Sequence, residues 1–422
     1  MLCASGFSTI AQFAHPRVYF IYTDIIFFIG DALAVLAVIL WIAVKITRSS
    51  SGHKVAYRDQ SHLILHPSAF ILLLLALFLL SSISIFWSQD WRTSLYVSLH
   101  FWLVFLLILS LRDWREAWKL AMFGLCAALS IQLITGFTGF ALQSTAFLKP
   151  FDMEWPGILD PAIRGASVVQ LADGLRVLRA YGTLPHPNIL GGFALISLLG
   201  SAGLFLANKK PNYSALVLFS LGIILIGLTF SRSAWLGLIA FIAILVFKSN
   251  HFDRKQLFLL VSISVLTITL TLYPLRDLVF TRISNAPVAT EQLSTFGRSW
   301  LSEQALAMMR EHPLTGVGIG SFILELADYA IEGASIEPVH NIFLLAGSEL
   351  GIVGLLLVIC LFISIALIIV KTQKPKAILA SATLAGLGVI SLFDHYLWTL
   401  APGRIMLGLA LGLWIGQVAN EA

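Results

Sequence analysis

The sequence predicts an all-α integral membrane protein: a polytopic bundle of about eleven or twelve transmembrane helices with two long loops on one side. Of its 422 residues, 58% are hydrophobic and only 12% are charged, and the mean hydropathy is +0.89. Soluble domains carry about 25% charged residues, so this chain lacks the polar surface that water would require. Its apolar runs also repeat nearly end to end, at the ~20-residue length that crosses a bilayer. A soluble globular domain is therefore excluded.

Eleven apolar runs mark the expected spans. They lie near residues 18–44, 67–87, 94–111, 118–142, 190–207, 214–230, 233–247, 257–273, 342–370, 377–393 and 404–418. Eleven spans put the N-terminus outside, whereas a further short span at 1–14 would make twelve and put both termini inside. Because no tandem repeat is visible, residues 1–422 are expected to form a single polytopic membrane domain.

Lysine predicts which ends of these spans face the cytoplasm. Five short connections, which fall on every second loop, are rich in lysine or arginine: 45–66, 112–119, 208–213, 248–256 and 371–376. Cytoplasmic loops carry such an excess of positive charge. Ten of the eleven lysines lie on that side and only Lys149 lies opposite, yet eleven of the sixteen arginines lie on the other face. Arginine is therefore expected to serve something other than topology.

Two outer loops, about 143–189 and 274–339, are too long to be simple connectors. Loops beyond ~15 residues in a compact protein are usually functional or disordered. The second has apolar residues at helical spacing over 296–312, followed by Pro313 and a glycine-rich turn, so an ordered lid at the outer membrane face is expected. The turn at 316–320 superficially resembles a phosphate-binding loop. It lacks the Lys-Ser/Thr pair of such loops, which favours a simple tight turn.

Several classes of binding site find little support. Cys3, Cys126 and Cys360 lie in apolar surroundings without metal-ligand spacing. The pI near 9.1 comes with no basic stripe apart from the spans, so no nucleic acid partner is expected. Asp152 and Glu154 are the only close carboxylate pair in the first long loop, and they are expected to be solvated there. No metal and no cofactor are therefore expected.

Arginines at the outer face are the first candidate site residues. Arg232 stands between two apolar runs, where a charge costs several kcal/mol unless it reaches water or a partner. A snorkelling anchor is the alternative role for this residue. Arg298 lies on the amphipathic helix, where a solvated surface position is the alternative. Two converging arginines would suit a diphosphate, because guanidinium groups bind phosphate oxygens in a bidentate manner.

Histidines form the second group of candidates. His340 begins a span directly after the second long loop, where it acts either as a catalyst or as a helix cap. His186 lies between two prolines, which favours a structural role. Asp394 and His395 lie in a short outer loop and show no arrangement beyond that of an interfacial belt.

Taken in order, four segments resemble the O-antigen ligase and polymerase superfamily of bacterial envelope glycan enzymes. These segments read YGTLPHPNILGG, TFSRSAWLG, GRSWLSEQALAMMREHPLTGVGIGSF and HNIFLLAGSELGIVGLL. The stretches SSISIFWSQDWRTSLYVSLHFWLVFLLIL and FDHYLWTLAPGR are similar to the family as well, so the resemblance runs from about residue 17 to the C-terminus. One departure is the number of spans, because members usually have twelve and the first one here is truncated or missing.

The resemblance implies a metal-independent glycosyltransferase in the bacterial inner membrane, with its active site on the periplasmic face. Such enzymes move a glycan from an undecaprenyl-diphosphate carrier to an acceptor hydroxyl. The expected partners are this lipid-linked donor, lipid A–core or another glycan acceptor, and membrane lipid. By motif, the resemblance implies that Arg232, Arg298 and His340 are catalytic. The neighbouring residues expected to bind substrate are Arg179, His186, Arg282, Arg310 and Asn341.

Two other interpretations stay open on the sequence alone. An O-antigen polymerase or a protein O-glycan ligase of the same fold would use the same kind of donor with a different acceptor. A lipid-glycan flippase or other transporter would place polar residues in mid-membrane and often show inverted repeats. Here the candidate residues gather at one face and no repeat is visible, which favours an enzyme.

Overall fold

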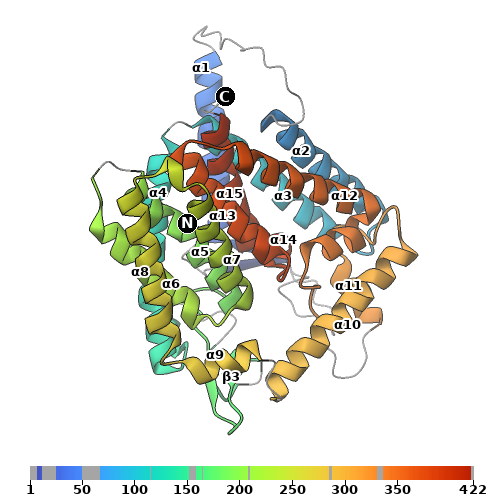
Figure 1. Ribbon diagram of the computed structural model, residues 1–422. Coiled ribbons are helices and arrows are strands. Elements are labelled where there is room, and N and C mark those ends of the chain that lie inside the picture. The colour runs from blue at the N-terminus through green and yellow to red at the C-terminus, as the bar shows by residue number, and fades with distance from the viewer. Residues whose placement is uncertain are drawn as a thin grey trace.

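The computed structural model describes residues 7–11, 25–49, 67–114, 116–151, 158–163, 165–207, 210–284, 288–329 and 336–419. Within these residues the protein is a bundle of helices with two small sheets, as Figure 1 shows. This architecture confirms the all-α polytopic membrane class that the apolar runs predicted. Helices suit such runs because they satisfy the backbone hydrogen bonds internally, as hydrocarbon requires.

The helices follow the chain in this order: α1 (Ile29–Ser49), α2 (Pro67–Ile83), η3 (Ser84–Trp87), α3 (Trp91–Asp113), α4 (Ala117–Leu142), η4 (Ala146–Phe151), α5 (Pro187–Leu206), α6 (Tyr213–Leu228), α7 (Arg232–Phe247), η5 (Ser249–His251), α8 (Arg254–Leu272), α9 (Arg276–Ile283), α10 (Ala289–Glu311), α11 (Phe322–Asp328), α12 (Ile342–Lys371), α13 (Pro375–Ser391), α14 (Tyr396–Thr399) and α15 (Ala401–Ala419). Two antiparallel pairs accompany them: β1 (Phe7–Ala11) with β2 (Ile25–Phe28), and β3 (Val168–Gln170) with β4 (Arg176–Leu178).

Apolar helices occupy the expected runs. Seven of the described helices are long and apolar enough to cross a membrane: α2 continued by η3, α3, α4, α5, α8, α12 and α15. Three shorter apolar helices, α6, α7 and α13, lie where further spans were expected. The 21-residue α1 occupies the first expected run.

The N-terminal region differs from the prediction. The first span was expected near 18–44, but α1 begins at Ile29, because Ile25–Phe28 pairs with Phe7–Ala11 as strands. Isoleucine and phenylalanine, which make up the whole of β2, favour this pairing. The alternative of a short helical span at 1–14 is wrong for the residues described there, since a five-residue strand takes their place.

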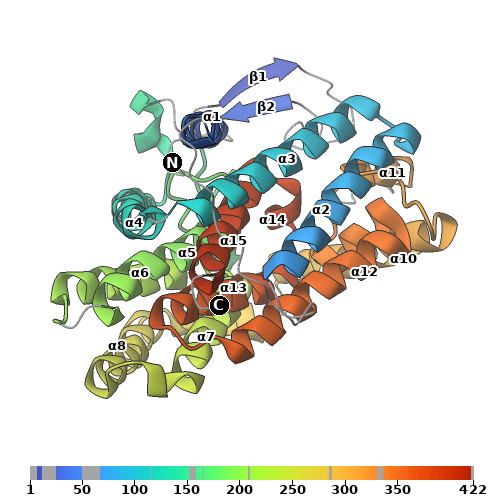
Figure 2. The ribbon, with the colours of Figure 1, turned by 90° about the horizontal axis from the view of Figure 1, so that it is seen from above.

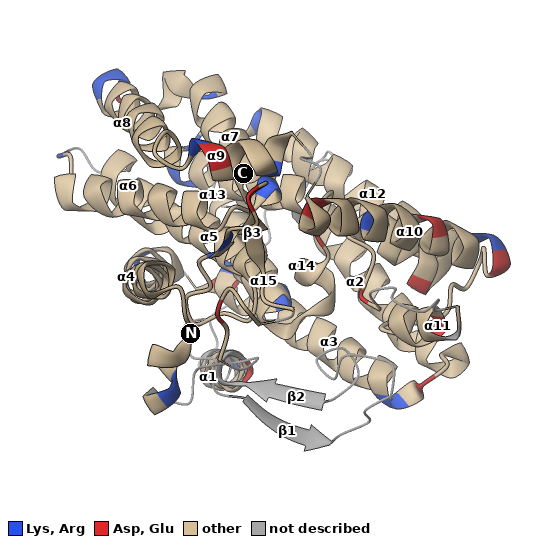
Figure 3. Ribbon diagram, turned by 90° about the horizontal axis from the view of Figure 1, so that it is seen from below, with Lys and Arg blue, Asp and Glu red and all other residues tan. Residues whose placement is uncertain are grey.

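The bundle has two chemically different ends. Lys45 Nζ lies 2.7 Å from Asp113 Oδ2, and Lys248 Nζ donates to the Val370 carbonyl at 2.6 Å. These contacts join the C-terminal ends of α1 and α3, and those of α7 and α12, and we call this the lysine end. The opposite end carries α9, α10 and the β3–β4 hairpin, and we call it the site end (Figure 1). Figure 3 views the protein from the site end, where charged residues gather at helix ends and connections while the helix shafts carry few.

Helix α5 lies at the centre of the bundle. All of its residues except Leu204 are buried, as expected of a helix that is apolar on every side. Helices α7 and α13 approach closely, since a Cβ on Gly237 would lie 2.9 Å from the Gly386 carbonyl oxygen. Such contacts between small residues allow membrane helices to pack tightly. This core holds the starts of α5 and α7 beside the end of α13, all at the site end.

The glycine-rich turn at 316–320 is structural. Its three glycines all have positive φ, which residues with a side chain rarely adopt. The amides of Val317 and Gly318 donate at 2.9 Å to two carbonyls that are available because α12 breaks at Gly351. These amides are therefore not free to hold a phosphate, and the prediction of a tight turn is confirmed. The turn fixes the C-terminal end of α10 onto α12, beside which α10 lies in Figure 2.

The predicted lid corresponds to α9, α10 and the turn that follows. Helix α10 runs over Ala289–Glu311 and so begins earlier than the expected 296. Its buried residues include Leu301, Ala305 and Met308, the positions whose spacing predicted the helix. The ordered helix expected in the second long loop is therefore present.

Candidate active site

A strained turn between α6 and α7 presents Arg232. Helix α6 ends at Leu228, and Phe230 then adopts a φ of +47°, a conformation that aromatic residues rarely take. Such strain persists only where the surroundings impose it, and it clusters at functional sites. Phe230 is fully buried, with its ring centroid 6.3 Å from those of Phe140 and Trp235. Arg232 follows as the first residue of α7.

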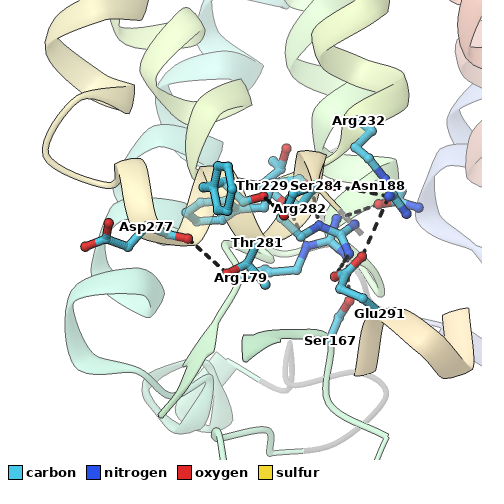
Figure 4. A network of polar contacts seen from close by, with 12 residues as sticks. Ser167, Arg179, Asn188, Thr229, Arg232, Asp277, Thr281, Arg282, Ser284 and Glu291 are labelled. Carbon is cyan, nitrogen blue, oxygen red and sulfur yellow. Dashed lines mark hydrogen bonds and ion pairs between the residues drawn. The ribbon is translucent and has the colours of Figure 1, made fainter. Parts of the chain in front are cut away.

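Two buried arginines hold this turn in place, as Figure 4 shows. Arg179 donates from Nε to the Thr229 carbonyl at 2.6 Å. Its two Nη atoms donate to Ser167 and Asn188, at 2.7 Å and 2.6 Å. Arg282 donates from Nε to the next carbonyl of the turn at 3.2 Å. The two arginines are 5% and 7% exposed, so their donors serve the turn and not the substrate that the sequence suggested.

Glu291, in the first turn of α10, joins Arg282 to Arg232. Its Oε1 accepts a short hydrogen bond from Arg282 Nη1, and its Oε2 lies 3.7 Å from Arg232 Nη1. Arg232 Nη1 itself donates to the Arg282 carbonyl at 3.1 Å. Glu291 is only 1% exposed, and a carboxylate buried so deeply requires cationic or hydrogen-bonding partners. This contact fixes the N-terminal end of α10 to α7 and α9.

Arg232 and Arg298 differ from the two bracing arginines because they stay partly exposed. The Arg232 side chain is 27% exposed, and Arg298 is half-buried on α10. Arg298 follows Glu291 by about two helical turns, so both residues lie on one face of α10. The charge of Arg298 acts on both Arg232 and His340, so it lies near each of them. These two guanidinium groups are therefore able to bind an anion between the turn and α12.

His340 lies at the site end, just before α12, but it is not the cap of that helix. Asn341 Oδ1 accepts from the amides of Phe343 and Leu344, at 2.9 Å and 3.1 Å. Asn341 Nδ2 also donates to the Leu392 carbonyl at 3.2 Å. Asn341, which was expected to bind substrate, thus stabilises the helix start, and the ring of His340 is left for another role.

His340 pairs with a second histidine. Its ring meets that of His395 edge to face, with centroids 5.0 Å apart and an interplanar angle of 85°. His395 Nδ1 lies 2.7 Å from Thr399 Oγ1, which donates its own proton to the His395 carbonyl at 3.3 Å. His395 Nδ1 is therefore the donor, and Nε2 carries the lone pair. His340 Nδ1 is buried and has no hydrogen-bond partner among the described residues.

Both histidines are held neutral by their surroundings. Burial, with a smaller contribution from the charge of Arg298, lowers the pKa of His340 from 6.5 to about 3. Burial likewise lowers the pKa of His395 to about 3, where His340 and Arg298 add to the effect and Asp394 opposes it. A neutral imidazole has a lone pair that accepts a proton. The pair is thus suited to take a proton from a hydroxyl group.

A chain of hydrogen bonds connects the braced turn to the histidine pair. Asn188 accepts from Arg179 and donates from Nδ2 to Asp394 Oδ2 at 2.7 Å. Asp394 Oδ1 accepts from the His395 amide at 2.9 Å. His186 Nδ1 accepts from the Asn188 amide at 3.1 Å and so caps α5, while burial lowers the pKa of His186 well below its ordinary value. His186 therefore has the structural role that its flanking prolines favoured.

The same residues include a possible set of metal ligands, although none was expected. Donor atoms of His340, Asp394 and His395 lie within 4.8 Å of one another, and zinc is bound by histidine nitrogen and carboxylate oxygen. The nearby positive charge of Arg298 opposes a cation at this position. The two carboxylates considered earlier, at positions 152 and 154, lie outside the described residues.

Arg310 is the one predicted site residue that does not join this cluster. It is exposed near the C-terminal end of α10, and at 1.5 Å per residue it lies ~18 Å along the helix from Arg298. Three residues join that were not predicted, namely Glu291, Asp394 and His395. An adjacent acid and histidine at the end of a span was a detectable signal, whereas nothing in the sequence distinguished Glu291 from other loop carboxylates.

A second polar cluster is buried inside the bundle. Asp31 Oδ2 and His100 Nε2 lie 3.6 Å apart, with side chains that are 0% and 6% exposed. Arg404 and Glu349 are each 2% exposed, and the Arg404 guanidinium lies 6.0 Å from the ring centroid of Tyr96. The expectation that polar residues gather only at the outer face is therefore wrong. Seven-residue spacing suggested that Asp31 shares a helix face with position 24, but not that it pairs with α3.

An apolar cavity of about 510 Å³ lies between α12 and helices α2, α3, α13 and α15. Its lining runs from Phe247 and Val370, near the lysine end, to Ile342 and Leu392, beside the histidine pair. Almost all the lining residues are hydrophobic. A hydrocarbon chain suits such a cavity, because burying apolar surface is favourable.

Comparison with known families places these residues in a wider group. The family model for O-antigen ligase matches residues 215–359. This region contains the α6–α7 turn, α9, α10 and the start of α12, and therefore Arg232, Glu291, Arg298 and His340. No curated protein matches the chain at a significant level.

Proposed function

Because this chain belongs to the O-antigen ligase superfamily, we propose that it transfers a glycan from an undecaprenyl-diphosphate carrier to an acceptor hydroxyl. The acceptor is lipid A–core or a comparable glycan lipid. The observation that carries the proposal is the arrangement of two partly exposed arginines, Arg232 and Arg298, beside the neutral His340. An anion, a proton acceptor and an apolar chain all find suitable groups there.

Arg232 and Arg298 are the donor-binding pair in this mechanism. The bond between the sugar's anomeric carbon and the phosphate oxygen breaks, and the diphosphate leaves with the electron pair. Its negative charge grows in the transition state, where fixed guanidinium groups stabilise it most. Arg179 and Arg282 keep the turn rigid so that Arg232 need not reorganise.

His340 is the general base. The acceptor oxygen forms a bond to the anomeric carbon, and its proton passes to the imidazole. In the empty site a pKa of about 3 makes His340 a weak base. A bound diphosphate offsets the charge of Arg298 and so raises that pKa. Base strength therefore increases when the donor is present, which limits wasteful proton transfer in the empty site.

The apolar cavity is the binding place for the carrier's hydrocarbon tail. It begins at Ile342, two residues from His340, and continues toward the lysine end. A polyprenyl chain in this cavity leaves its diphosphate at the site end, near the arginines. The tail then contributes affinity through its buried apolar surface.

The site end faces the periplasm in this proposal. The support is the lysine content of the opposite end, which the positive-inside rule assigns to the cytoplasm. Single-cysteine variants at Lys374 and Leu171 test this with an impermeant thiol reagent applied from outside. Labelling is expected at position 171 and not at 374, and the reverse pattern would overturn the orientation.

The central experiment is a transfer assay with purified protein in detergent. A synthetic undecaprenyl-diphosphate glycan is offered with lipid A–core, a free glycan or a protein acceptor, and glycosylated lipid A–core is the expected product. Detergent micelles have no two compartments, so product formation separates glycan transfer from flipping. Elongated glycan or modified protein instead would identify a polymerase or a protein ligase. No product with any acceptor would refute the enzyme proposal.

A further inference from the structure

The carboxylate of Glu291 lies between the bracing arginine and the donor-binding arginine. It projects from the first turn of α10 toward Arg282 on α9 and Arg232 on α7 (Figure 4). With only 1% of its surface exposed, Glu291 brings a full negative charge into the place where the proposed site must bind a diphosphate. A competing anion built into an anion site calls for a physical explanation.

The two contacts of Glu291 are unequal. Oε1 accepts a short hydrogen bond from Arg282, whose side chain is almost fully buried and also donates to the α6–α7 turn. Oε2 lies 3.7 Å from Arg232 Nη1 and accepts no hydrogen bond from any described residue. A hydrogen bond to a carboxylate is normally 2.7–2.9 Å long. Glu291 is thus held firmly by Arg282 and only electrostatically by Arg232.

We propose that Glu291 is an internal anion that neutralises Arg232 in the empty site and competes with the diphosphate of the donor. The inference rests on the proposed function and concerns the same site. When the donor arrives, its phosphate oxygens form the close bonds to Arg232 that Oε2 lacks. After transfer, the fixed charge of Glu291 repels the carrier diphosphate and favours its release.

The location of Glu291 on α10 extends this effect to the second arginine. Arg298 lies on the same face of α10, about two turns further along. The far end of α10 is fixed to α12 through the glycine-rich turn. Movement at the Glu291 end therefore alters the distance between Arg232 and Arg298, so the internal anion and the donor-binding pair are mechanically linked.

Substitution Glu291→Gln tests the proposal, with inorganic pyrophosphate as the probe. The amide oxygen of glutamine still accepts the hydrogen bond from Arg282, but the charge is gone. Removing a negative charge a few ångströms from the anion is expected to tighten pyrophosphate binding by about tenfold. In the transfer assay, half-maximal inhibition by pyrophosphate is expected at a correspondingly lower concentration. Turnover at saturating donor is expected to fall, because the diphosphate product leaves more slowly.

The matched control is Glu303→Gln. Glu303 is exposed on the same helix, ~18 Å from Glu291 along its axis, and its substitution changes the net charge equally. Its pyrophosphate affinity is expected to equal that of the wild type. Equal affinities for all three proteins would overturn the proposal. Weaker binding by Glu291→Gln would also overturn it, since Glu291 would then orient Arg232 for the anion and not compete with it.

Calorimetry of pyrophosphate binding keeps this test separate from the test of function. If the wild type transfers glycan but Glu291→Gln binds pyrophosphate no tighter, the internal anion is refuted and the function stands. If no transfer occurs but the variant binds pyrophosphate more tightly, the reverse holds. Should Glu291→Gln fail to accumulate, Glu291→Asp serves in its place. The shorter side chain draws the charge away from Arg232, so tighter pyrophosphate binding is again expected.

Discussion

The rings of His340 and His395 meet edge to face with centroids 5.0 Å apart, although one precedes α12 and the other follows α13. Each ring excludes water from the other, and burial is the main reason that both have a pKa of about 3. A protonated pair would also add positive charge next to Arg298. The contact therefore keeps a neutral proton acceptor at the mouth of the bundle, beside groups that bind anions.

Substitution His340→Asn is expected to reduce turnover by ~10²-fold or more, the usual scale of general acid–base contributions. Donor binding is expected to survive, because the arginines hold the diphosphate. Asn341 already caps α12, so asparagine at position 340 removes the base without removing the cap. Turnover and donor affinity are measured on the same purified variant. Full turnover would leave His340 with a packing role only, and lost donor binding would make it a ligand of the diphosphate.

The pH dependence of kcat/KM, which reports the free enzyme, is expected to rise well below pH 6.5. The folded pKa of His340 is lowered from 6.5 to about 3, so the ring stays neutral over that interval. The unfolded chain takes up the proton below pH 6.5, so this contribution to stability is complete above pH 6.5 and is lost as the pH falls toward about 3. A bound diphosphate is expected to move the rise in kcat to higher pH. A limb of kcat/KM at or above pH 6.5 would contradict the depressed pKa.

Substitutions Arg232→Lys and Arg298→Lys are each expected to abolish most transfer activity while insertion into the membrane stays normal. An ammonium group is a point charge and cannot reproduce the bidentate contact of a guanidinium with phosphate. Arg310→Lys, on the same helix as Arg298 but far from the site, is the matched control and is expected to retain activity. Initial transfer rates at equal protein amounts provide the measurement. Near wild-type rates in the first two variants would make these arginines membrane anchors.

Substitution Arg179→Lys is expected to act on stability before activity. Lysine cannot reach the Thr229 carbonyl, Ser167 and Asn188 at once, and each buried group left unpaired costs about 1–3 kcal/mol. Thermal unfolding in detergent is expected to shift to lower temperature. Arg276→Lys, whose side chain is 64% exposed, is expected to leave it unchanged. Unaltered unfolding together with weakened donor binding would return Arg179 to the substrate-binding role first expected of it.

Transfer activity is expected to persist in the presence of a chelator. The charge of Arg298 opposes a cation beside His340 and His395, although these two and Asp394 could supply ligands. The measurement is the rate before and after dialysis against chelator, followed by addition of zinc, magnesium or manganese. Activity that is lost and then restored by one of these ions would show a metal requirement, and substitution of Asp394 would then locate it.

Local properties of the chain predicted the membrane class, the apolar runs and the candidate residues Arg232, Arg298 and His340. Hydropathy, helical spacing and lysine bias can each be evaluated within a short window, so no tertiary contact is needed to detect them. The same local patterns failed at the N-terminus, because β1 and β2 pair across a gap in sequence that hydropathy does not register.

Only the tertiary structure decided which arginines remain available and what surrounds the histidine. Arg179 and Arg282 look like Arg232 in the sequence, yet both are used by carbonyls of a turn that lies about fifty residues away along the chain. Asp394 and Glu291 likewise acquire meaning only where α5, α7, α10 and α13 end beside one another. Hydrogen bonds and ion pairs between distant segments depend on angles and distances that the packed helices impose, and no short stretch of sequence contains them.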